Sequence, residues 1–410
     1  NTAIYQPQIG DINIYGGEIT ANEVIAMKVG TLNVYGGTLT STGTLVNPAL
    51  GNNNGSEYTG AVISLTSNKG YPGDIEVNIT GGKFIAEKAY ALFEGISLDK
   101  DGNAVIDKTN VIKLNITGGE FIGGTDADRA VYIQNEKDIL DLKLTGGTYN
   151  KAVDDAYLSN AINRANDGDT VKLFTDILID KTFGFTKNLA IDLNGHKIDS
   201  KVAYMIDLLD NSANKQTVSF INTAEKEAEM NGQLSIVPKS PDKSYEVTIG
   251  KNVKITAKYA VYVQGNDVDN AIILNVYGKL ISKEDTNGSA LSGNGSKGYG
   301  GTVINIFDGA IIRGNDHTSA IYQPQRGVIN IYGGEITGNH AISMKVGTLN
   351  VYGGTLKSTG TLVNPVLGNN NGSEDTGAVV SLTSNKKYPG DIEVNINGGK
   401  FIAEKSYALY

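Results

Sequence analysis

The segment AIYQPQIGDINIYGGEIT, which begins at Ala3, returns almost unchanged as AIYQPQRGVINIYGGEIT at Ala320, an offset of 317 residues. The same register relates residues 1–93 to residues 318–410 without a gap, and about four positions in five are identical. Such close copies indicate tandem duplication of a whole module. The chain spans one module length plus an overlap, so we interpret it as a piece of a longer polypeptide that begins and ends inside modules.

A shorter pattern recurs inside the module, in which apolar residues flank an Asn and are followed by Gly-Gly. The clear copies are INIYGGEI from Ile12, LNVYGGTL from Leu32, VNITGGKF from Val77 and LNITGGEF from Leu114. Looser copies are LKLTGGTY from Leu142, LNVYGKLI from Leu274 and INIFDGAI from Ile304. In an extended strand alternate side chains point to opposite faces, so the apolar residues would point inward and the Asn outward. Gly-Gly then predicts a tight corner.

Strands this short, with one apolar face, cannot stand alone and must stack on their copies. The composition agrees, because 51 glycines and only 8 prolines suit short strands joined by tight turns. Parallel crossovers are nearly always right-handed. We therefore predict an all-β fold, a right-handed parallel β-helix, which is a solenoid. The segments expected as surface loops are LGNNNGSEYTG from Leu50, its duplicate from Leu367 and NGSALSGNGSKGYGG from Asn287.

One segment, KAVDDAYLSNAINRAN at about residues 151–166, breaks the β pattern. Asp154 and Asp155 stand where the positive end of a helix dipole favours carboxylates. The apolar residues that follow have helical spacing: Leu158, Ala161, Ile162 and Ala165. We predict a short amphipathic helix that caps the end of a β-helix, because an open end would expose apolar core and unpaired strand edges.

The run from this helix through DGDTV at Asp167 to IDLNGHKI at Ile191 resembles the start of pectate-lyase-like β-helix domains of bacterial cell-surface proteins. The resemblance implies that a module starts near Lys151. Residues 1–150 would then be the C-terminal part of one module. Residues 151–410 would be the capping helix followed by the N-terminal and central part of the next. The resemblance specifies a fold and not a chemistry.

Polysaccharide lyases and hydrolases of this fold need an acidic or calcium-bound site together with Arg, Lys or His as base or charge clamp. The chain has only three histidines. His196 follows Asn-Gly and is interpreted as part of a turn. The duplicate has Glu23 where His340 stands, and no histidine lies near the equivalent of His317. We therefore predict no catalytic residues and no enzyme, with a polysaccharide-active enzyme as the least favoured alternative.

The segment DKDGNAVID is the one candidate for a metal. Asp99, Asp101, Asn103 and Asp107 have the alternating oxygen spacing of a calcium loop, but Ala104 stands where such loops need glycine. We expect a solvated turn here, with calcium binding as the alternative and no cofactor otherwise.

The outward position before Gly-Gly carries a row of aromatic and threonine residues: Tyr15, Tyr35, Thr80, Thr117 and Thr145, and later Tyr277, Tyr332 and Tyr352. Stacked strands would bring these side chains into ladders about 4.8 Å apart. The five tyrosines form either a glycan-stacking strip or a ladder that holds the sheet together, and we favour the second. A second outward row has the same two interpretations: Asn13, Asn33, Asn78 and Asn115.

The composition also argues against several classes of binding partner. A net charge of -9 without a Lys/Arg run argues against nucleic acid and anionic membrane surfaces. No apolar stretch approaches the roughly 20 residues that span a bilayer, and without cysteine no disulfide can form. Near-identical modules in tandem suit a protein that extends over a long distance and presents many copies of one binding site. We expect an adhesive fibre that is extracellular, either at the cell surface or secreted. Its modules would be joined end to end, and its candidate ligand is a surface polysaccharide or glycan. The alternative is a subunit that self-assembles into a filament or surface layer.

Overall fold

The computed structural model describes residues 1–47, 58–105, 109–134, 139–208, 215–238, 240, 242–266, 268, 271–284, 286–294, 300–363 and 375–410. Most of the loop segments expected from Leu50 and Leu367, and part of the one from Asn287, lie outside these residues. Strand accounts for 49% of the structure and helix for 2%, which confirms an all-β chain. Two compact units are present, each described by itself: Asn1–Arg164 with Phe174–Leu178, and Ala165–Leu173 with Ile179–Tyr410.

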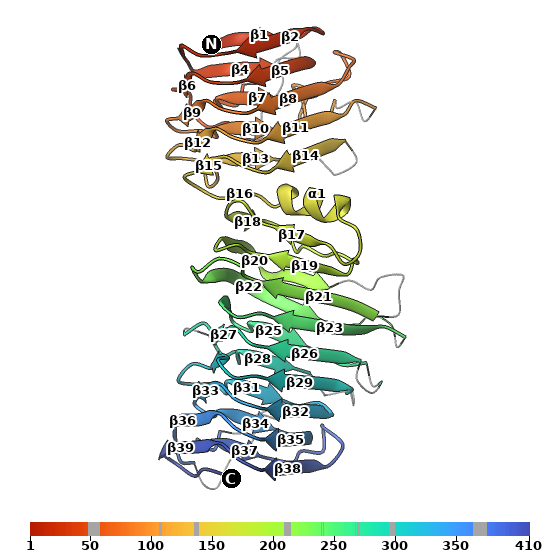
Figure 1. The fold of residues 1–410 in the computed structure, drawn as a ribbon, viewed down its shortest axis with the longest axis vertical. Coiled ribbons are helices and arrows are strands. Elements are labelled where there is room, and N and C mark those ends of the chain that lie inside the picture. The colour runs from red at the N-terminus through yellow and green to blue at the C-terminus, as the bar shows by residue number, and fades with distance from the viewer. Residues whose placement is uncertain are drawn as a thin grey trace. The chain divides into compact units, whose positions relative to one another are not determined.

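The first unit consists of three parallel sheets whose strands recur in fixed order (Figure 1). The first sheet contains β1 (Thr2–Gln6), β4 (Glu23–Met27), β7 (Ile63–Leu65), β10 (Leu92–Glu94), β13 (Val131–Ile133), β16 (Val153–Asp154) and, through Ile177 and Leu178, β18 (Ile177–Ile179). The second contains β2 (Asp11–Ile14), β5 (Gly30–Val34), β8 (Ile75–Ile79), β11 (Ile112–Ile116) and β14 (Leu140–Leu144). The third contains β3 (Glu18–Ala21), β6 (Thr38–Ser41), β9 (Lys83–Ala86), β12 (Glu120–Ile122) and β15 (Thr148–Tyr149).

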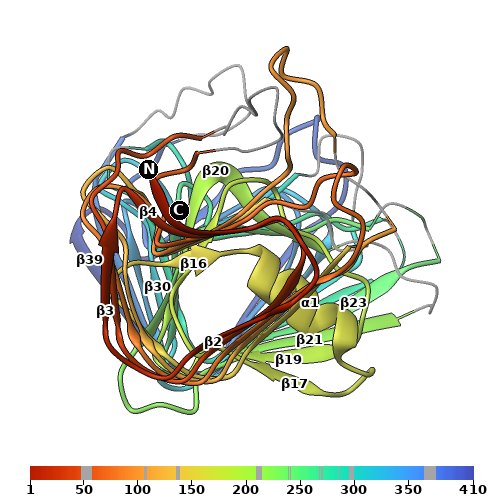
Figure 2. The same ribbon diagram turned by 90° about the horizontal axis from the view of Figure 1, so that it is seen from above.

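The chain passes through these three sheets in turn, so β2, β3 and β4 are followed by β5, β6 and β7 in the same order. Figure 2 shows the strands of this unit superposed along three sides. The register keeps equivalent residues together, and Asn13, Asn33 and Asn78 are direct partners on neighbouring strands. Leu32 and Val34, expected to point inward, are fully buried. This arrangement is consistent with a parallel solenoid.

The expected helix is present as α1 (Ala156–Arg164), which is shorter than residues 151–166 because β16 precedes it and Arg164 ends it. Asp154 Oδ1 accepts a 3.1 Å hydrogen bond from the Ala156 amide, as a capping carboxylate does at the start of a helix. Leu158 and Ile162 are buried, as their spacing predicts.

Helix α1 lies against the outer edge of β14, and its polar side chains pair with the backbone of that strand. Asn160 Oδ1 accepts a hydrogen bond of 3.3 Å from the Leu142 amide, while Arg164 donates to the Leu142 carbonyl oxygen. Arg164 also pairs with the Asp141 carboxylate at 2.7 Å. The helix thus occupies a strand edge that no further strand of the second sheet covers among the described residues of this unit.

The second unit has one sheet of nine parallel strands: β17 (Thr170–Lys172), β19 (Leu189–Asp192), β21 (Lys215–Ile221), β23 (Ser244–Ile249), β26 (Ile272–Val276), β29 (Thr302–Ile306), β32 (Gly327–Ile331), β35 (Gly347–Val351) and β38 (Ile392–Ile396). Opposite it the long strands β20 (Lys197–Leu208) and β22 (Ala228–Ile236) pair along their length.

After β22 the opposite wall divides, because β24 and β25 each pair with a different half of β22. One half continues as β24 (Val253–Ala257), β27 (Lys279–Ser282), β30 (Ile311–Arg313), β33 (Glu335–Gly338), β36 (Thr355–Thr361) and β39 (Lys400–Lys405). The other continues as β25 (Val261–Val263), β28 (Leu291–Gly293), β31 (Ile321–Gln323), β34 (Ile342–Met344) and β37 (Val380–Leu382).

The Gly-Gly corners are tight for the reason that the sequence suggests. Gly334, the second glycine of a pair, has φ +86°, and a Cβ there would lie 2.6 Å from the carbonyl oxygen of Ala310 on the preceding corner. A left-handed backbone and a close approach therefore both require glycine.

Candidate functional site

The outer face of the nine-stranded sheet carries two parallel rows of side chains, which together we call the ladder face. The amide row consists of Asn275, Asn305, Asn330, Asn350 and Asn395. The aromatic row, two residues further along the strands, consists of Tyr277, Phe307, Tyr332 and Tyr352. Residues two apart in a strand share a face, so both rows lie on the same side of the sheet.

The amide row is held together by hydrogen bonds between neighbouring strands. Asn305 donates to Asn275 at 2.9 Å, Asn330 to Asn305 at 3.0 Å, Asn350 to Asn330 at 2.8 Å and Asn395 to Asn350 at 3.0 Å. Each such bond uses one of the two N–H groups of a primary amide. The row therefore stabilises the sheet and still presents further N–H groups at the surface.

The aromatic row is a stack of nearly parallel rings. Centroid distances are 4.3 Å from Tyr277 to Phe307, 5.3 Å from Phe307 to Tyr332 and 5.3 Å from Tyr332 to Tyr352. A sugar that stacks on an aromatic ring needs an open ring face. Here the inner rings cover each other's faces, so the stack offers mainly ring edges and phenol hydroxyls, with Tyr332 and Tyr352 about half exposed.

The first unit carries the same two rows, starting from the equivalents of Asn330 and Tyr332. Tyr15 stacks on Tyr35 at 5.1 Å with 6° between the ring planes. Asn33 donates to Asn13 at 3.0 Å, and the amide row continues through Asn78 and Asn115. The structure thus brings the five tyrosines that the sequence singles out into two stacks, one in each unit.

Phe307 is a further member of the stack, outside the row of tyrosines expected from the sequence. It fills the place between Tyr277 and Tyr332, and without it the aromatic row would be interrupted. The signal was present, because INIFDGAI from Ile304 is a loose copy of the motif with Phe at the tyrosine position.

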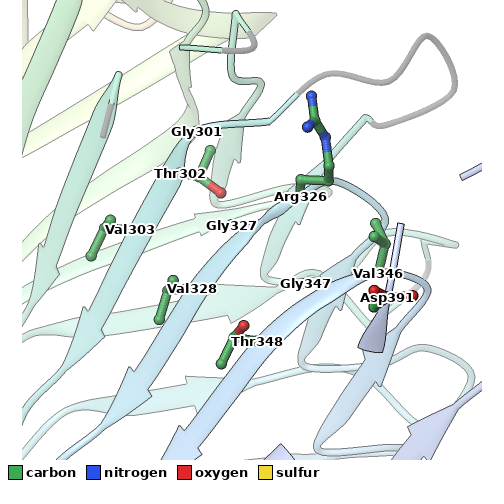
Figure 3. Close-up of a pocket in the computed structure, with 10 residues that line it drawn as sticks. All are labelled: Gly301, Thr302, Val303, Arg326, Gly327, Val328, Val346, Gly347, Thr348 and Asp391. Atoms are coloured by element: carbon green, nitrogen blue, oxygen red, sulfur yellow. The ribbon is translucent and has the colours of Figure 1, made fainter. Parts of the chain in front are cut away.

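An open groove of about 470 Å³ adjoins the amide row at the start of β29, β32 and β35 (Figure 3). Val303 and Val328 form part of its floor, two residues before Asn305 and Asn330 on the same strands. Its other lining residues are Gly301, Thr302, Arg326, Gly327, Val346, Gly347, Thr348 and Asp391. Figure 3 shows Arg326 projecting from the turn before β32. The groove offers hydroxyl, guanidinium and carboxylate groups to a polar ligand.

The groove is one of the places where the two copies differ. At the offset of 317 residues, Ile9 corresponds to Arg326 and Asp11 to Val328, whereas Thr31 corresponds to Thr348. The first copy therefore has an apolar side chain where the second has a cation.

The proposed calcium ligands form a local turn. Asp99 Oδ1 accepts hydrogen bonds from the amides of Asp101, at 2.9 Å, and Asn103, at 2.8 Å. These bonds, that from Asn103 first, lower the pKa of the Asp99 carboxyl. Asp107 lies outside the described residues. In the part of the chain that the structure describes, no group of three or more His, Cys, Asp or Glu side chains is placed to hold a metal ion.

Two histidines lie in turns. The His196 amide donates to the Leu193 carbonyl oxygen at 2.9 Å, across the turn at Asn194 and Gly195. The His317 amide donates to Asn315 Oδ1 at 3.0 Å.

His340 is buried between Ser319 and Asp375, an arrangement that superficially suggests a catalytic triad. Its Nδ1 lies 3.3 Å from Ser319 Oγ, and its Nε2 lies 3.3 Å from Asp375 Oδ1. However, Nε2 accepts hydrogen bonds from the amides of Thr376 and Gly377, so the ring proton resides on Nδ1. A protonated Nδ1 cannot remove a proton from Ser319, and the trio does not form the base of a nucleophilic site in this state.

Comparison with protein family models, with curated proteins and with solved structures finds no match to this chain. None of the described residues forms a helix of the length and hydropathy needed to cross a membrane.

Proposed function

We propose that this chain is part of an extracellular fibre built from right-handed parallel β-helix modules, and that its ladder face binds surface glycans. One observation carries the proposal. Two near-identical copies of the sequence present the same outward rows, with Tyr15 on Tyr35 in one and Tyr332 on Tyr352 in the other.

The fibre part of the proposal rests on how the strands support each other. Each strand obtains its hydrogen bonds from neighbouring passes of the chain, so length can be added by repeating the same motif without a new core. The resemblance to β-helix domains of bacterial surface proteins is consistent with this use. Tandem modules of this kind would give reach at the cell surface, and we propose no catalytic role for them.

The glycan part rests on the chemistry of the exposed groups. Amide N–H groups, phenol hydroxyls, the hydroxyl of Thr348 and the guanidinium of Arg326 suit hydroxyl-rich ligands. The ring faces are largely used within the stack, so each site would bind weakly. Repetition along a fibre compensates for weak binding, because linked sites raise avidity by orders of magnitude.

The test is a glycan array probed with the whole 410-residue chain and with two variants. Arg326→Ile converts the groove to the residue found in the first copy, and Tyr332→Phe removes one hydroxyl from the ladder face while keeping the ring. The control is Tyr204→Phe, which changes an exposed tyrosine on β20. We expect glycan binding by the native chain and the control, and a loss of about tenfold or more in the first two variants.

Other outcomes distinguish the alternatives. Absence of binding to every glycan, together with concentration-dependent filaments in negative stain, would replace the adhesive function with self-assembly. Shortening of a polysaccharide during incubation would instead show an enzyme.

A further inference from the structure

The two copies of the module differ at one buried position that holds a neighbouring segment in place. Glu23 begins β4 in the first copy, and its equivalent in the second copy is His340, just before β34. Both side chains are almost fully buried. The segment that they contact has the same Thr-Gly-Ala sequence in both copies, residues 59–61 and 376–378.

In the first copy the carboxylate accepts three hydrogen bonds. Glu23 Oε1 accepts from the Thr59 amide at 3.0 Å and from the Thr59 hydroxyl at 2.8 Å. Glu23 Oε2 accepts from the Thr2 hydroxyl at 2.8 Å. The carboxylate thereby ties residues 59–61 to the strands β1 and β4.

In the second copy a single imidazole nitrogen accepts the hydrogen bonds that hold the equivalent segment. His340 Nε2 accepts from the Thr376 amide at 2.9 Å and from the Gly377 amide at 3.1 Å. Ser319, the equivalent of Thr2, lies 3.3 Å from Nδ1. The two hydrogen bonds to Nε2 require the neutral ring, because a protonated Nε2 would direct its hydrogen at the two amide donors.

The charged groups around the two side chains differ as well. Burial lowers the pKa of His340 to about 4, which the Asp375 carboxylate opposes and the Lys345 ammonium reinforces. Burial raises the pKa of Glu23 above its usual value, against the hydrogen bonds from Thr59 and Thr2 and the ammonium of Lys28. Tyr58, the equivalent of Asp375, is a further titratable group near Glu23 among the described residues.

We propose that acid releases residues 376–378 from the second copy, whereas residues 59–61 of the first copy stay bound. Protonation of His340 removes the acceptor of the Thr376 amide and one of the two acceptors of the Gly377 amide, the other being Asp375 Oδ1 at 3.1 Å. Protonation of Glu23 neutralises a buried charge and leaves a carboxyl group that still accepts hydrogen bonds. The exchange of one residue between duplicated modules therefore makes one of them acid-sensitive.

We call the form with residues 376–378 bound to His340 closed and the form with these residues released open. The pKa of His340 in the two forms gives the direction in which opening depends on pH. Once released into water, His340 regains an ordinary pKa near 6.5, so between about pH 6.5 and 4 the open form binds a proton that the closed form excludes. Opening therefore increases as the pH falls, by up to about tenfold per pH unit. For Glu23 the closed form takes up the proton first, so acid does not favour opening there.

Hydrogen exchange followed by mass spectrometry tests this in one sample of the intact chain, after correction for the intrinsic pH dependence of exchange. The two segments can be told apart, because Tyr58 and Ile63 in the first copy are Asp375 and Val380 in the second. Between pH 6.5 and 4.5 we expect exchange at Thr376 and Gly377 to rise by about 40-fold, and exchange at Thr59 and Gly60 to rise less than about twofold.

Two variants make the cause specific. His340→Gln supplies a neutral acceptor that does not titrate, so the acid-induced rise at residues 376–378 should disappear. Glu23→His should transfer the rise to residues 59–61. Circular dichroism at pH 7 verifies that both variants fold. An equal response of the two copies in the native chain, or a rise that persists in His340→Gln, would overturn the proposal.

Discussion

The rings of Tyr332 and Tyr352 lie face to face on neighbouring strands, with centroids 5.3 Å apart and planes inclined by 7°. The two residues are 20 positions apart in the sequence and occupy the same place in successive copies of the motif. Their contact exists only because β32 and β35 pair in register, with Asn330 beside Asn350. The aromatic stack is thus a direct consequence of the repeat.

Removing one inner ring should weaken the second unit. Tyr332 contacts Phe307 on one side and Tyr352 on the other, so Tyr332→Ala loses two stacking contacts. We expect a loss of about 1–3 kcal/mol in the free energy of unfolding, measured by urea denaturation. Tyr332→Phe keeps both contacts and should lose much less. Equal losses in the two variants would show that the hydroxyl, and not the stack, stabilises the sheet.

A methyl group at a Gly-Gly corner should have an effect that depends on the neighbouring corner. Gly309 and Gly334 occupy the same position of the motif with φ +83° and +86°, but only at Gly334 would a Cβ meet another backbone atom, 2.6 Å from Ala310 O. Gly309→Ala should cost about 1–2 kcal/mol for the left-handed backbone alone. Gly334→Ala should cost clearly more. Similar melting temperatures for the two variants would contradict the close approach as the reason for glycine.

The repeat predicts the parts of the fold that depend on local pattern. Alternation placed Leu32 and Val34 inside, Gly-Gly marked the corners, and helical spacing placed Leu158 and Ile162 on a buried face. Each of these follows from a period of two or of 3.6 residues, and such a period is visible in the sequence itself. The helix began later than expected because Val153 and Asp154 pair as a strand before it.

The rest depends on contacts between residues far apart in the chain. The groove combines Thr302, Arg326 and Asp391 from three separate passes of the chain, and no local motif unites them. The sequence shows only that His340 has no matching histidine in the first copy, whereas the structure shows that Glu23 and His340 occupy equivalent positions and hold equivalent segments. Sequence comparison showed the exchange but not its environment.

The polar side chains of α1 should matter for the first unit. Asn160→Ala leaves the Leu142 amide without its acceptor, and an unpaired buried amide costs about 1–3 kcal/mol. Ser159→Ala is the matched control, because it makes a similar gain in helix propensity at the preceding position. We expect a lower urea midpoint for Asn160→Ala only. A loss of the same size in both variants would assign the effect to the helix itself and not to the covered strand edge.

Lys28 should make the free energy of unfolding increase as the pH rises above about 7. It is buried and donates to Thr66 Oγ1 at 2.6 Å, and burial lowers its pKa to about 7, which the Glu23 carboxylate opposes. The unfolded chain keeps the proton to a pH near 10.5, so stability rises between pH 7 and 10.5.

The measurement is the difference in unfolding free energy between the native chain and Lys28→Met at pH 7, 8 and 9. This difference should shift in favour of the native chain by at most about 1.4 kcal/mol per pH unit. The matched variant Lys88→Met, at an exposed position, should give a flat difference. A flat difference for Lys28→Met as well would contradict burial of the ammonium.

The central claim is that strands distant in sequence stack in register to form one continuous outward face. The chain has no cysteine, so two spin labels can be attached at Asn275→Cys and Asn395→Cys, the ends of the amide row in the second unit. Four strand spacings separate them, so double electron–electron resonance should give one narrow distance distribution consistent with backbones roughly 20 Å apart. A broad distribution, or one centred beyond about 35 Å, would contradict the claim.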